Sequence, residues 1–366
     1  MSVLVTSFLV SLLVSLWLIR YNHLHAHLSA DSDMGGVQKF HSNPVPRIGG
    51  LGIFLGLLAA FIVRYLQNIE VGSFGLMLIL CALPTFILGF TEDITKQVGV
   101  KTRLLASVIS AGLAGYLLGA WLTSVQVLGI DNLMLTFPMI AIGITCFAVA
   151  GVANAFNIID GYNGLASMVA VIILGGIAYV AFQVGDVLIM IAAIALVGSL
   201  AGFLVWNYPR GLIFLGDGGA YLIGFWIAEL SILLTSRHAE VSKWFPLLLC
   251  IYPIFETIFT IYRRVVLKRV HPGMPDASHL HQLIYRRVVR VGNDKDDAQG
   301  QVDRNSMTSP YLWLLCLLAV IPAVLFWRYH VVLKFFVVVF ALTYIGLYWA
   351  IVRYQVPEYL IYRKDK

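Results

Sequence analysis

The chain has 366 residues, of which 60% are hydrophobic and only 12% are charged, and its mean hydropathy is +0.86. This composition excludes an ordinary soluble domain and predicts an integral membrane protein. The formal net charge of +6 indicates an uneven distribution of basic residues across the membrane and an attraction for anionic lipid or phosphate. It implies no nucleic-acid partner.

Apolar runs long enough to cross a bilayer, about 20 residues each, recur from one end of the chain to the other. No internal repeat stands out, and a separate soluble domain is not indicated. We therefore expect one all-α membrane domain over residues 1–366, a polytopic protein with about 10–11 transmembrane helices. The runs begin near Val3, Ile48, Phe74, Leu104, Leu133, Leu165, Val187, Gly219, Phe245, Tyr311 and Leu333.

The Lys and Arg residues predict which side of the membrane each connection faces. If the N-terminus lies outside, the inner connections are residues 20–47, 91–103, 154–164, 207–218 and 263–308, together with the tail. They hold twenty of the 25 Lys and Arg residues and nearly all the unusual polar side chains, and the last is a cytoplasmic loop rich in His and Arg. A transporter would be expected to carry ionisable groups near the middle of the bilayer, so this clustering favours an enzyme.

The first unusual inner segment runs from Lys39 to Gly50 and reads KFHSNPVPRIGG. Pro44 and Pro46 stiffen its backbone, and the two adjacent glycines allow another segment to approach closely. A simple turn that leads into the second span explains the same pattern. By itself, the segment leaves both interpretations open.

The next inner segment, GFTEDITKQVGVKTR, places the carboxylates of Glu92 and Asp93 directly after an apolar run, and Lys101 and Arg103 follow. Carboxylates beside cations suit a metal ion or a phosphate group. A solvated loop with weak ion pairs is an equally supported alternative. In either case, the two basic residues are placed to attract anionic headgroups.

The segment NAFNIIDGYNGL carries amides and a carboxylate between two long apolar runs. Polar groups without partners are costly in a membrane, so the pattern indicates a functional site. Asn154, Asn157 and Asp160 recur at every third position and share one face if the segment is helical. Gly161 and Gly164 then end the helix, which leaves the Asp160 carboxylate accessible to a hard cation such as Mg²⁺. For the asparagines, hydrogen bonding between neighbouring helices is the alternative.

The fourth inner segment, NYPRGLIFLGDGG, begins at Asn207 and carries Asp217 among three glycines just before an apolar run. Helix N-termini and glycine-rich backbone bind anions, and a carboxylate adds a metal ligand. An N-cap role for Asp217 is the simpler alternative, but it does not account for the glycines.

The last inner segment carries histidines among six arginines and one lysine. His279 and His281 are two positions apart, so they do not share a helix face, and this spacing is weak support for a metal site. With Arg264 and Asp276 nearby in the sequence, the composition suits a phosphate group or a nucleotide better.

These five segments, in this order along the chain, resemble the motifs of the polyprenyl-phosphate N-acetylhexosamine-1-phosphate transferase family, also called glycosyl transferase family four. PVPRIGG is similar to the opening P-R-x-G-G segment, and TEDITK lies where an acidic pair precedes a basic residue. NAFNIIDGYNGL resembles N-x-x-N-x-x-D-G-x-x-G-L, FLGDGG resembles F-x-G-D-x-G, and PDASHLHQ resembles P-D-x-x-H-x-H-H. The resemblance covers most of the chain, from Lys39 to Arg290.

The resemblance implies transfer of a sugar-1-phosphate from a UDP-sugar to undecaprenyl phosphate, with release of UMP and a requirement for Mg²⁺, or Mn²⁺ in its place. It implies a catalytic set of Glu92, Asp93, Asp160 and Asp217, in which the last two bind the metal. Because a phosphomonoester is mostly dianionic at neutral pH, we expect direct in-line attack without a covalent intermediate. The expected substrate-binding residues are Lys101, Arg103, Asn154, Asn157, Asn207, Arg264, Asp276, His279 and His281.

Three positions depart from the family pattern. Glu92 replaces the first acid of the usual Asp pair, Asn163 stands where a second Asp is common, and Gln282 replaces a third histidine. The last two departures speak against the branch that transfers phospho-muramoyl-pentapeptide. We therefore expect a UDP-N-acetylhexosamine donor and a bacterial inner-membrane enzyme that initiates a surface polysaccharide such as O-antigen or capsule. A polyisoprenoid-phosphate or nucleotide-sugar transporter is the alternative, and a homodimer is left open.

Overall fold

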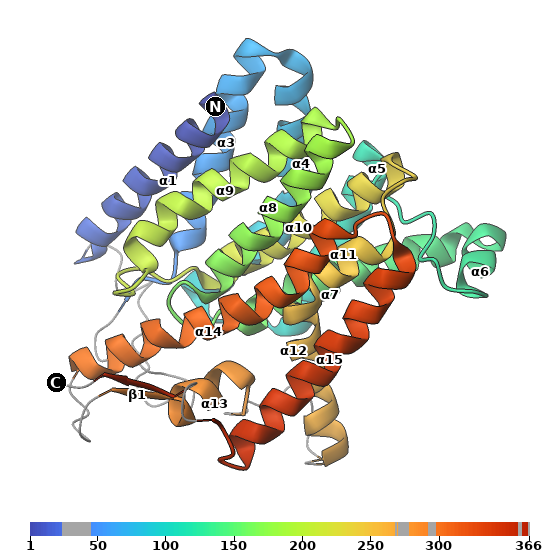
Figure 1. Cartoon of the computed structure of the whole chain (residues 1–366). Helices are drawn as coiled ribbons and strands as arrows, with labels where there is room; N and C mark the ends of the chain where they lie inside the picture. The colour runs from blue at the N-terminus through green and yellow to red at the C-terminus, as the bar shows by residue number, and fades with distance from the viewer. Residues whose placement is uncertain (24–44, 268, 270–277, 292–297, 358–360, 365–366) are drawn as a thin grey trace.

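The computed structural model describes residues 1–23, 45–267, 269, 278–291, 298–357 and 361–364. Helices dominate this part of the chain, and two three-residue strands pair in parallel (Figure 1). The elements are α1 Ser2–Arg20, α3 Gly49–Gln67, α4 Ile69–Thr95, α5 Val100–Leu118, α6 Ile130–Thr136, α7 Pro138–Ile159, α8 Leu165–Gln183, α9 Val187–Asn207, α10 Gly216–Arg237, α11 Trp244–Leu249, α12 Ile251–Tyr262, the π-helix η1 Arg263–Leu267, α13 Leu280–Arg287, β1 Val289–Val291, α14 Ala298–Leu325, α15 His330–Val352 and β2 Tyr362–Lys364.

The predicted all-α membrane fold is confirmed. In the part of the chain that the structure describes, nine helices are long and apolar enough to cross a membrane. The helix α5 has the length of a span but carries Lys101 and Arg103 in its first turn. Neither α5 nor the short helices α11 and α12 is among these nine, so the described residues give fewer such helices than the predicted 10–11.

Two of the expected spans are interrupted, and proline explains both breaks. The run expected from Leu133 divides into the short helix α6 and the long helix α7, which begins with Pro138 at its first position. The run expected from Phe245 divides at Cys250 into α11 and α12, and Pro253 has no N–H to continue the helix across this point. Figure 1 shows α6 projecting to the side of the bundle.

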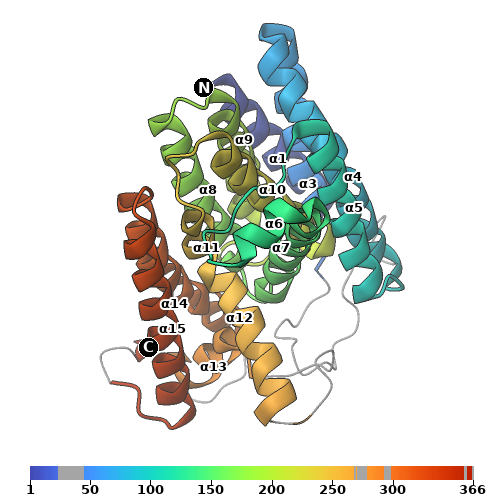
Figure 2. The ribbon, with the colours of Figure 1, turned by 90° about the vertical axis from the view of Figure 1, so that its right-hand side faces the viewer.

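The helix α10 forms the centre of the bundle, and its whole apolar stretch is buried. It is surrounded by α3, α4, α7, α8 and α9 (Figure 2). Such a helix is apolar all round, as expected for a span that faces only other helices. Its position matters for function because Asp217 lies in its first turn.

Glycines allow α3 and α4 to approach the beginning of α10 closely. A Cβ atom added to Gly50 would lie 2.4 Å from the backbone nitrogen of Gly219, and one added to Gly89 would lie 2.8 Å from the Cα atom of Gly218. Small residues at helix crossings permit this approach in membranes. The crossings bring the sequence segments PRIGG, TED and GDGG to one end of the bundle.

Candidate active site

The first contact between distant motifs is a short backbone pairing. Phe214 donates its N–H to the Pro46 carbonyl at 2.9 Å, and Gly49 and Gly50 donate to the carbonyls of Phe214 and Leu215 at 2.9 and 2.8 Å. This pairing holds the segment PRIGG against the segment that precedes α10. As a result, Arg47 extends toward Asp217, with 3.6 Å between Nη2 and Oδ1.

The N-terminus of α10, where an anion was expected to bind, binds the carboxylate of Asp93. This carboxylate, on α4, accepts hydrogen bonds from the backbone N–H groups of Asp217 at 2.7 Å and Gly218 at 2.9 Å. Gly216 precedes them with a φ of +75°, and a Cβ at this position would lie 2.0 Å from the Arg47 carbonyl. The glycines therefore serve close packing, and this part of the helix end is already occupied by a carboxylate of the protein.

Asp217 lies at the meeting point of three other helices. Its carboxylate forms an ion pair with Arg103 of α5 and accepts a hydrogen bond at 2.9 Å from the amide of Asn157 on α7. The Arg103 guanidinium lies 5.5 Å from the ring centroid of Tyr221, whose hydroxyl donates to Asn154 at 3.2 Å. Five of the polar residues expected at the site are thus brought together: Asp93, Arg103, Asn154, Asn157 and Asp217.

Asp160 completes this group from the end of α7. The half-buried carboxyl loses water, which raises its pKa from 3.8 to about 7, and the positive charge of Arg47 opposes this shift. The charge of Asp160 also acts on Asp93. Among the described residues, no hydrogen bond or ion pair engages its carboxylate. Asp93, Asp160 and Asp217, here called the acid cluster, therefore share one environment with Arg47.

The oxygen donors of the acid cluster fit a hard divalent cation. Carboxylate oxygens are the ligands that Mg²⁺ takes from proteins, with waters completing its coordination. The unpartnered carboxylate of Asp160 is the donor that a cation would stabilise most. Among the described residues, no group of three or more His, Cys, Asp or Glu side chains is arranged to hold a metal ion. Asp217 is already paired with the guanidinium of Arg103.

The histidine motif lies beside the turn that carries Asp160. The His281 ring packs edge-on against Tyr162, with centroids 5.3 Å apart, and its Nε2 atom would lie 3.3 Å from a Cβ added to Gly161. Burial, with the positive charges nearby, lowers the pKa of His281 to about 3. His281 is therefore neutral at physiological pH and packs under the turn.

His279 is held by side chains from α12. Its Nδ1 atom lies 3.0 Å from Oε1 of Glu256 and 3.2 Å from the hydroxyl of Thr260. Its ring is parallel to that of His281, with centroids 5.1 Å apart. On the other side of the ring, Nε2 lies 3.4 Å from Nη2 of Arg264.

Four of the expected site residues are not among those brought together: three lie elsewhere in the fold, and one lies outside the described residues. Glu92 accepts a hydrogen bond from the Val98 N–H at 2.6 Å and so closes the turn after α4, while Lys101 is exposed at the start of α5. The Asn207 amide accepts from the Gly164 N–H at 2.6 Å and donates to the Ile213 carbonyl at 2.8 Å. Asp276 lies outside the described residues.

Asn163 holds backbone rather than facing the acid cluster. Its amide donates to the Pro209 carbonyl at 2.9 Å, and its own N–H donates to the side chain of Asn305 at 2.8 Å. The residue is 1% exposed. Asn163 stands where an Asp is common in the family. Because its side chain bonds to the Pro209 carbonyl, this replacement takes no carboxylate away from the acid cluster.

Three residues that contact the predicted site residues were not expected from the sequence: Arg47, Glu256 and Tyr221. Arg47 lies in the segment PRIGG, so the same motif that indicated the glycines carried the signal. Glu256 lies in the apolar stretch PIFETIF, and an ionisable residue within such a stretch is by itself a sign of function. Tyr221, the third omission, carries no distinctive signal in a helix rich in aromatic and aliphatic residues.

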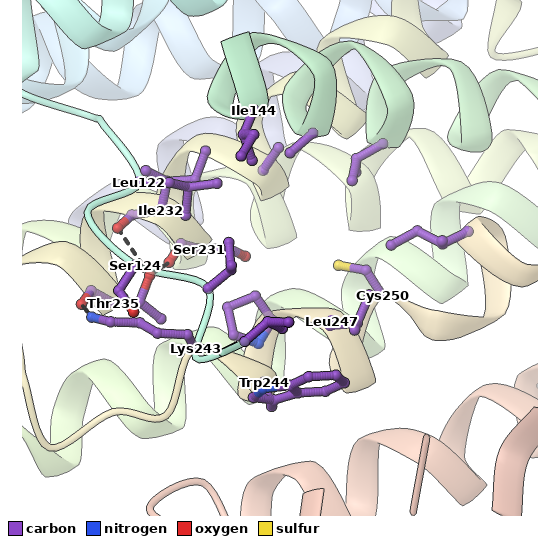
Figure 3. Close-up of a pocket in the computed structure, with 17 residues that line it drawn as sticks. Leu122, Ser124, Ile144, Ser231, Ile232, Thr235, Lys243, Trp244, Leu247 and Cys250 are labelled. Carbon is purple, nitrogen blue, oxygen red and sulfur yellow. Dashed lines mark hydrogen bonds between the residues drawn. The ribbon is translucent and has the colours of Figure 1, made fainter. Parts of the chain in front are cut away.

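An apolar cavity of about 270 Å³ lies away from the acid cluster, between α7, α10, α11, α12 and the connection before α6 (Figure 3). Ala228 in its lining is eleven residues beyond Asp217 along α10, about 16 Å at the helical rise. Lys243 is the only charged side chain in the lining, and its ammonium donates to the Thr235 carbonyl. The cavity can hold an apolar group but has no acid for chemistry.

The chain is similar to proteins of known families. Residues 75–235 match the model of glycosyl transferase family 4. The probable undecaprenyl-phosphate N-acetylglucosaminyl 1-phosphate transferase of Bacillus subtilis is 31% identical over 287 residues, which cover 76% of each chain. The undecaprenyl-phosphate alpha-N-acetylglucosaminyl 1-phosphate transferase of Thermotoga maritima is 28% identical over 251 residues, 69% of this chain and 72% of that protein.

A third relative comes from another branch. The phospho-N-acetylmuramoyl-pentapeptide-transferase of Bacillus licheniformis is 30% identical over 247 residues, 64% of this chain and 74% of that protein. The identities to the two branches are thus similar, but the match to the Bacillus subtilis protein extends over more of this chain.

Proposed function

Because this chain belongs to glycosyl transferase family 4, we propose that it transfers N-acetylhexosamine-1-phosphate from a UDP-sugar to undecaprenyl phosphate and releases UMP. The observation that carries this function is the convergence of Asp93, Asp160 and Asp217 with Arg47 and Arg103 at one end of α10. Acids beside arginines suit a reaction between two phosphate-bearing substrates.

The reaction needs positioning more than proton transfer. A phosphate oxygen of the acceptor attacks the β-phosphorus of the UDP-sugar, and the bond from this phosphorus to the oxygen that leaves with UMP breaks. The acceptor is already mostly dianionic at neutral pH, so no general base is required. Arg47 and Arg103 neutralise the phosphate oxygens and align the two groups for in-line attack, which is where most catalysis of phosphoryl transfer originates.

A magnesium ion, when bound, would supply Lewis-acid stabilisation of the diphosphate. Asp160 and Asp217 are the residues that would hold it, and Asn157 stays within reach of Asp217 to orient its carboxylate. Arg103, which pairs with Asp217, would bind a substrate phosphate beside it. Asp93 keeps the helix end fixed through its two hydrogen bonds.

We place the active site on the cytoplasmic side and the N-terminus outside. This orientation is supported by the excess of Lys and Arg in the connections at the end of the bundle that carries Asp217. For the sugar, N-acetylglucosamine is the first candidate because the relatives from Bacillus subtilis and Thermotoga maritima carry it in their names. Initiation of a surface polysaccharide follows from a lipid-linked product.

The function is tested with purified protein, radiolabelled UDP-N-acetylglucosamine, undecaprenyl phosphate and Mg²⁺. We expect release of UMP together with a lipid-linked radioactive product. Uptake of the UDP-sugar into vesicles without either product would instead identify a transporter. A panel of other UDP-sugars in the same assay identifies the preferred donor.

The acidity of Asp160 predicts how Mg²⁺ binding depends on pH. Because the pKa is about 7 and the cation binds the ionised carboxylate, we expect the apparent Mg²⁺ affinity to rise about tenfold per pH unit below pH 7 and to level off above it. Without Mg²⁺, the free energy of unfolding should fall as the pH rises from about 4 to about 7, since the unfolded chain releases this proton first.

The measurement is the rise in unfolding temperature that Mg²⁺ produces in nucleotide-free protein between pH 5.5 and pH 8, which avoids titration of the substrates. The variant Asp160→Asn should lose the pH dependence. A rise that is equally large at all pH values would remove Asp160 from the metal site.

A further inference from the structure

A carboxylate outside the acid cluster uses both of its oxygens in the protein interior. Glu256 on α12 is 0% exposed. Its Oε1 atom lies 3.0 Å from Nδ1 of His279 and accepts from the Leu280 N–H at 3.3 Å, while Oε2 accepts from the Tyr344 hydroxyl at 2.5 Å. A buried carboxylate costs several kcal/mol of desolvation. An apolar residue would fill this position at lower cost unless the charge has a task.

The partners of His279 determine where its proton lies. The guanidinium of Arg264 can only donate, so Nε2, 3.4 Å from Nη2, must accept. A neutral imidazole then carries its proton on Nδ1 and donates it to the Glu256 carboxylate, which can only accept when ionised. The three side chains form a chain of hydrogen bonds from Glu256 through His279 to Arg264.

The backbone of His279 is fixed independently of its ring. The residue caps the N-terminus of α13, and its N–H donates to the side chain of Gln282 at 3.1 Å. Figure 2 shows α13 between the lower ends of α12 and α15. Backbone and ring are therefore both held, which leaves the imidazole one orientation from which to accept a hydrogen bond from Arg264.

The chain of hydrogen bonds from Glu256 through His279 to Arg264, here called the relay, is connected to the proposed site through His281. The parallel ring of His281 connects His279 to the turn at Gly161, next to Asp160. An arginine held in one orientation loses little freedom when it forms a bidentate contact with a phosphate. A carboxylate that orients an imidazole is a recurrent device for fixing the tautomer of a functional histidine.

We propose that Glu256 and His279 are positioning residues, which act in series to aim the Arg264 guanidinium at the diphosphate of the nucleotide donor. This inference rests on the proposed function and adds to it a specific source of phosphate recognition. The inference assigns two different roles: Arg264 would touch the substrate, and His279 would act through Arg264.

The test compares inhibition of turnover by UDP and by uridine, which lacks phosphates. In the variant Glu256→Leu, we expect the inhibition constant of UDP to rise about 10- to 100-fold, as when other carboxylates that orient a histidine are removed, while that of uridine stays unchanged. Glu256→Gln retains an oxygen that can accept from Nδ1, so it should recover most of the loss. A site that is merely misfolded would weaken both inhibitors.

The matched control is Glu229→Leu. Glu229 on α10 is also 0% exposed, but no hydrogen-bond partner reaches either of its carboxylate oxygens within the described ranges. Its replacement should leave both inhibition constants within about twofold, as expected for distant sites, and should raise the unfolding temperature because an uncompensated buried acid is removed.

A double-mutant cycle decides whether Glu256 acts through Arg264. In the background Arg264→Ala, we expect Glu256→Leu to have almost no further effect on UDP inhibition; effects that multiply would overturn the inference.

Nitrogen-15 NMR of labelled histidine adds a readout that does not need turnover, since Nδ1 of His279 should be protonated in the parent protein. If the parent protein does not turn over UDP-sugars at all, the proposed function fails first, whereas normal turnover with multiplying effects refutes the relay alone.

Discussion

Replacing Asp217 with asparagine should lower kcat by about 100- to 1,000-fold or more, the range found when a group that stabilises transition-state charge is removed. Asparagine keeps the shape of the side chain and can still bond to Asn157, but it no longer balances Arg103 or binds a cation strongly. The same result is expected for Asp160→Asn, since its carboxylate is the acid of the cluster without a partner among the described residues. Product formation with saturating UDP-sugar and Mg²⁺ measures both.

The matched control is Asp186→Asn at the opposite end of the bundle. Asp186 caps α9 through a hydrogen bond from the Ile189 N–H at 3.0 Å and lies 3.0 Å from His238. Asparagine is an equally good N-cap, so activity should stay within about twofold, as is usual for changes away from the site. If Asp217→Asn and Asp160→Asn both behave like this control, the assignment of the active site is wrong.

The variant Gly50→Ala should lower both stability and activity. Its new Cβ would meet the backbone of Gly219 at 2.4 Å, and backbone atoms cannot move aside as a flexible side chain can. Overpacking of this kind costs about 1–3 kcal/mol of the free energy of unfolding. It would also push the start of α10 away from Asp93, and a displacement of about 1 Å at a catalytic group can cost about 100-fold in rate.

The control for this crossing is Gly175→Ala in the interior of α8. A Cβ at Gly175 meets no atom within 4 Å, so the change should raise helix stability by up to about 1 kcal/mol. Thermal unfolding in detergent and product formation are measured for both variants. Equal unfolding temperatures for the two would show that the crossing of α3 and α10 is looser than the structure indicates.

The spans were predictable because hydropathy is a local property. A run of apolar residues must become a helix in a bilayer whatever its neighbours are, since its backbone groups have no other partners. The interruptions at Pro138 and Cys250 were missed because the apolar character continues across them, although the positions of Pro138 and Pro253 carried the signal. The helix α14 also begins earlier, within the polar stretch from 263 to 308.

The candidate site was only partly predictable. The motif pattern indicated Asp93, Asp160 and Asp217, which the structure brings into one environment. The same pattern gave Glu92 and Asn207 equal weight, but the structure engages their side chains with nearby backbone. A polar residue in a motif has the same spacing whether it faces the substrate or supports a turn, so spacing could not separate the two roles.

By itself, the sequence determined that this chain crosses a membrane many times and which family it resembles, because each of these depends on residues close together in the chain. Only the tertiary structure decided which groups meet. Asp93 bonds to backbone 124 residues away, and Glu256 bonds to a histidine 23 residues away across a change of helix. Such contacts depend on how glycines let helices cross and on which carboxylates find donors in the interior, and neither is a property of any single segment.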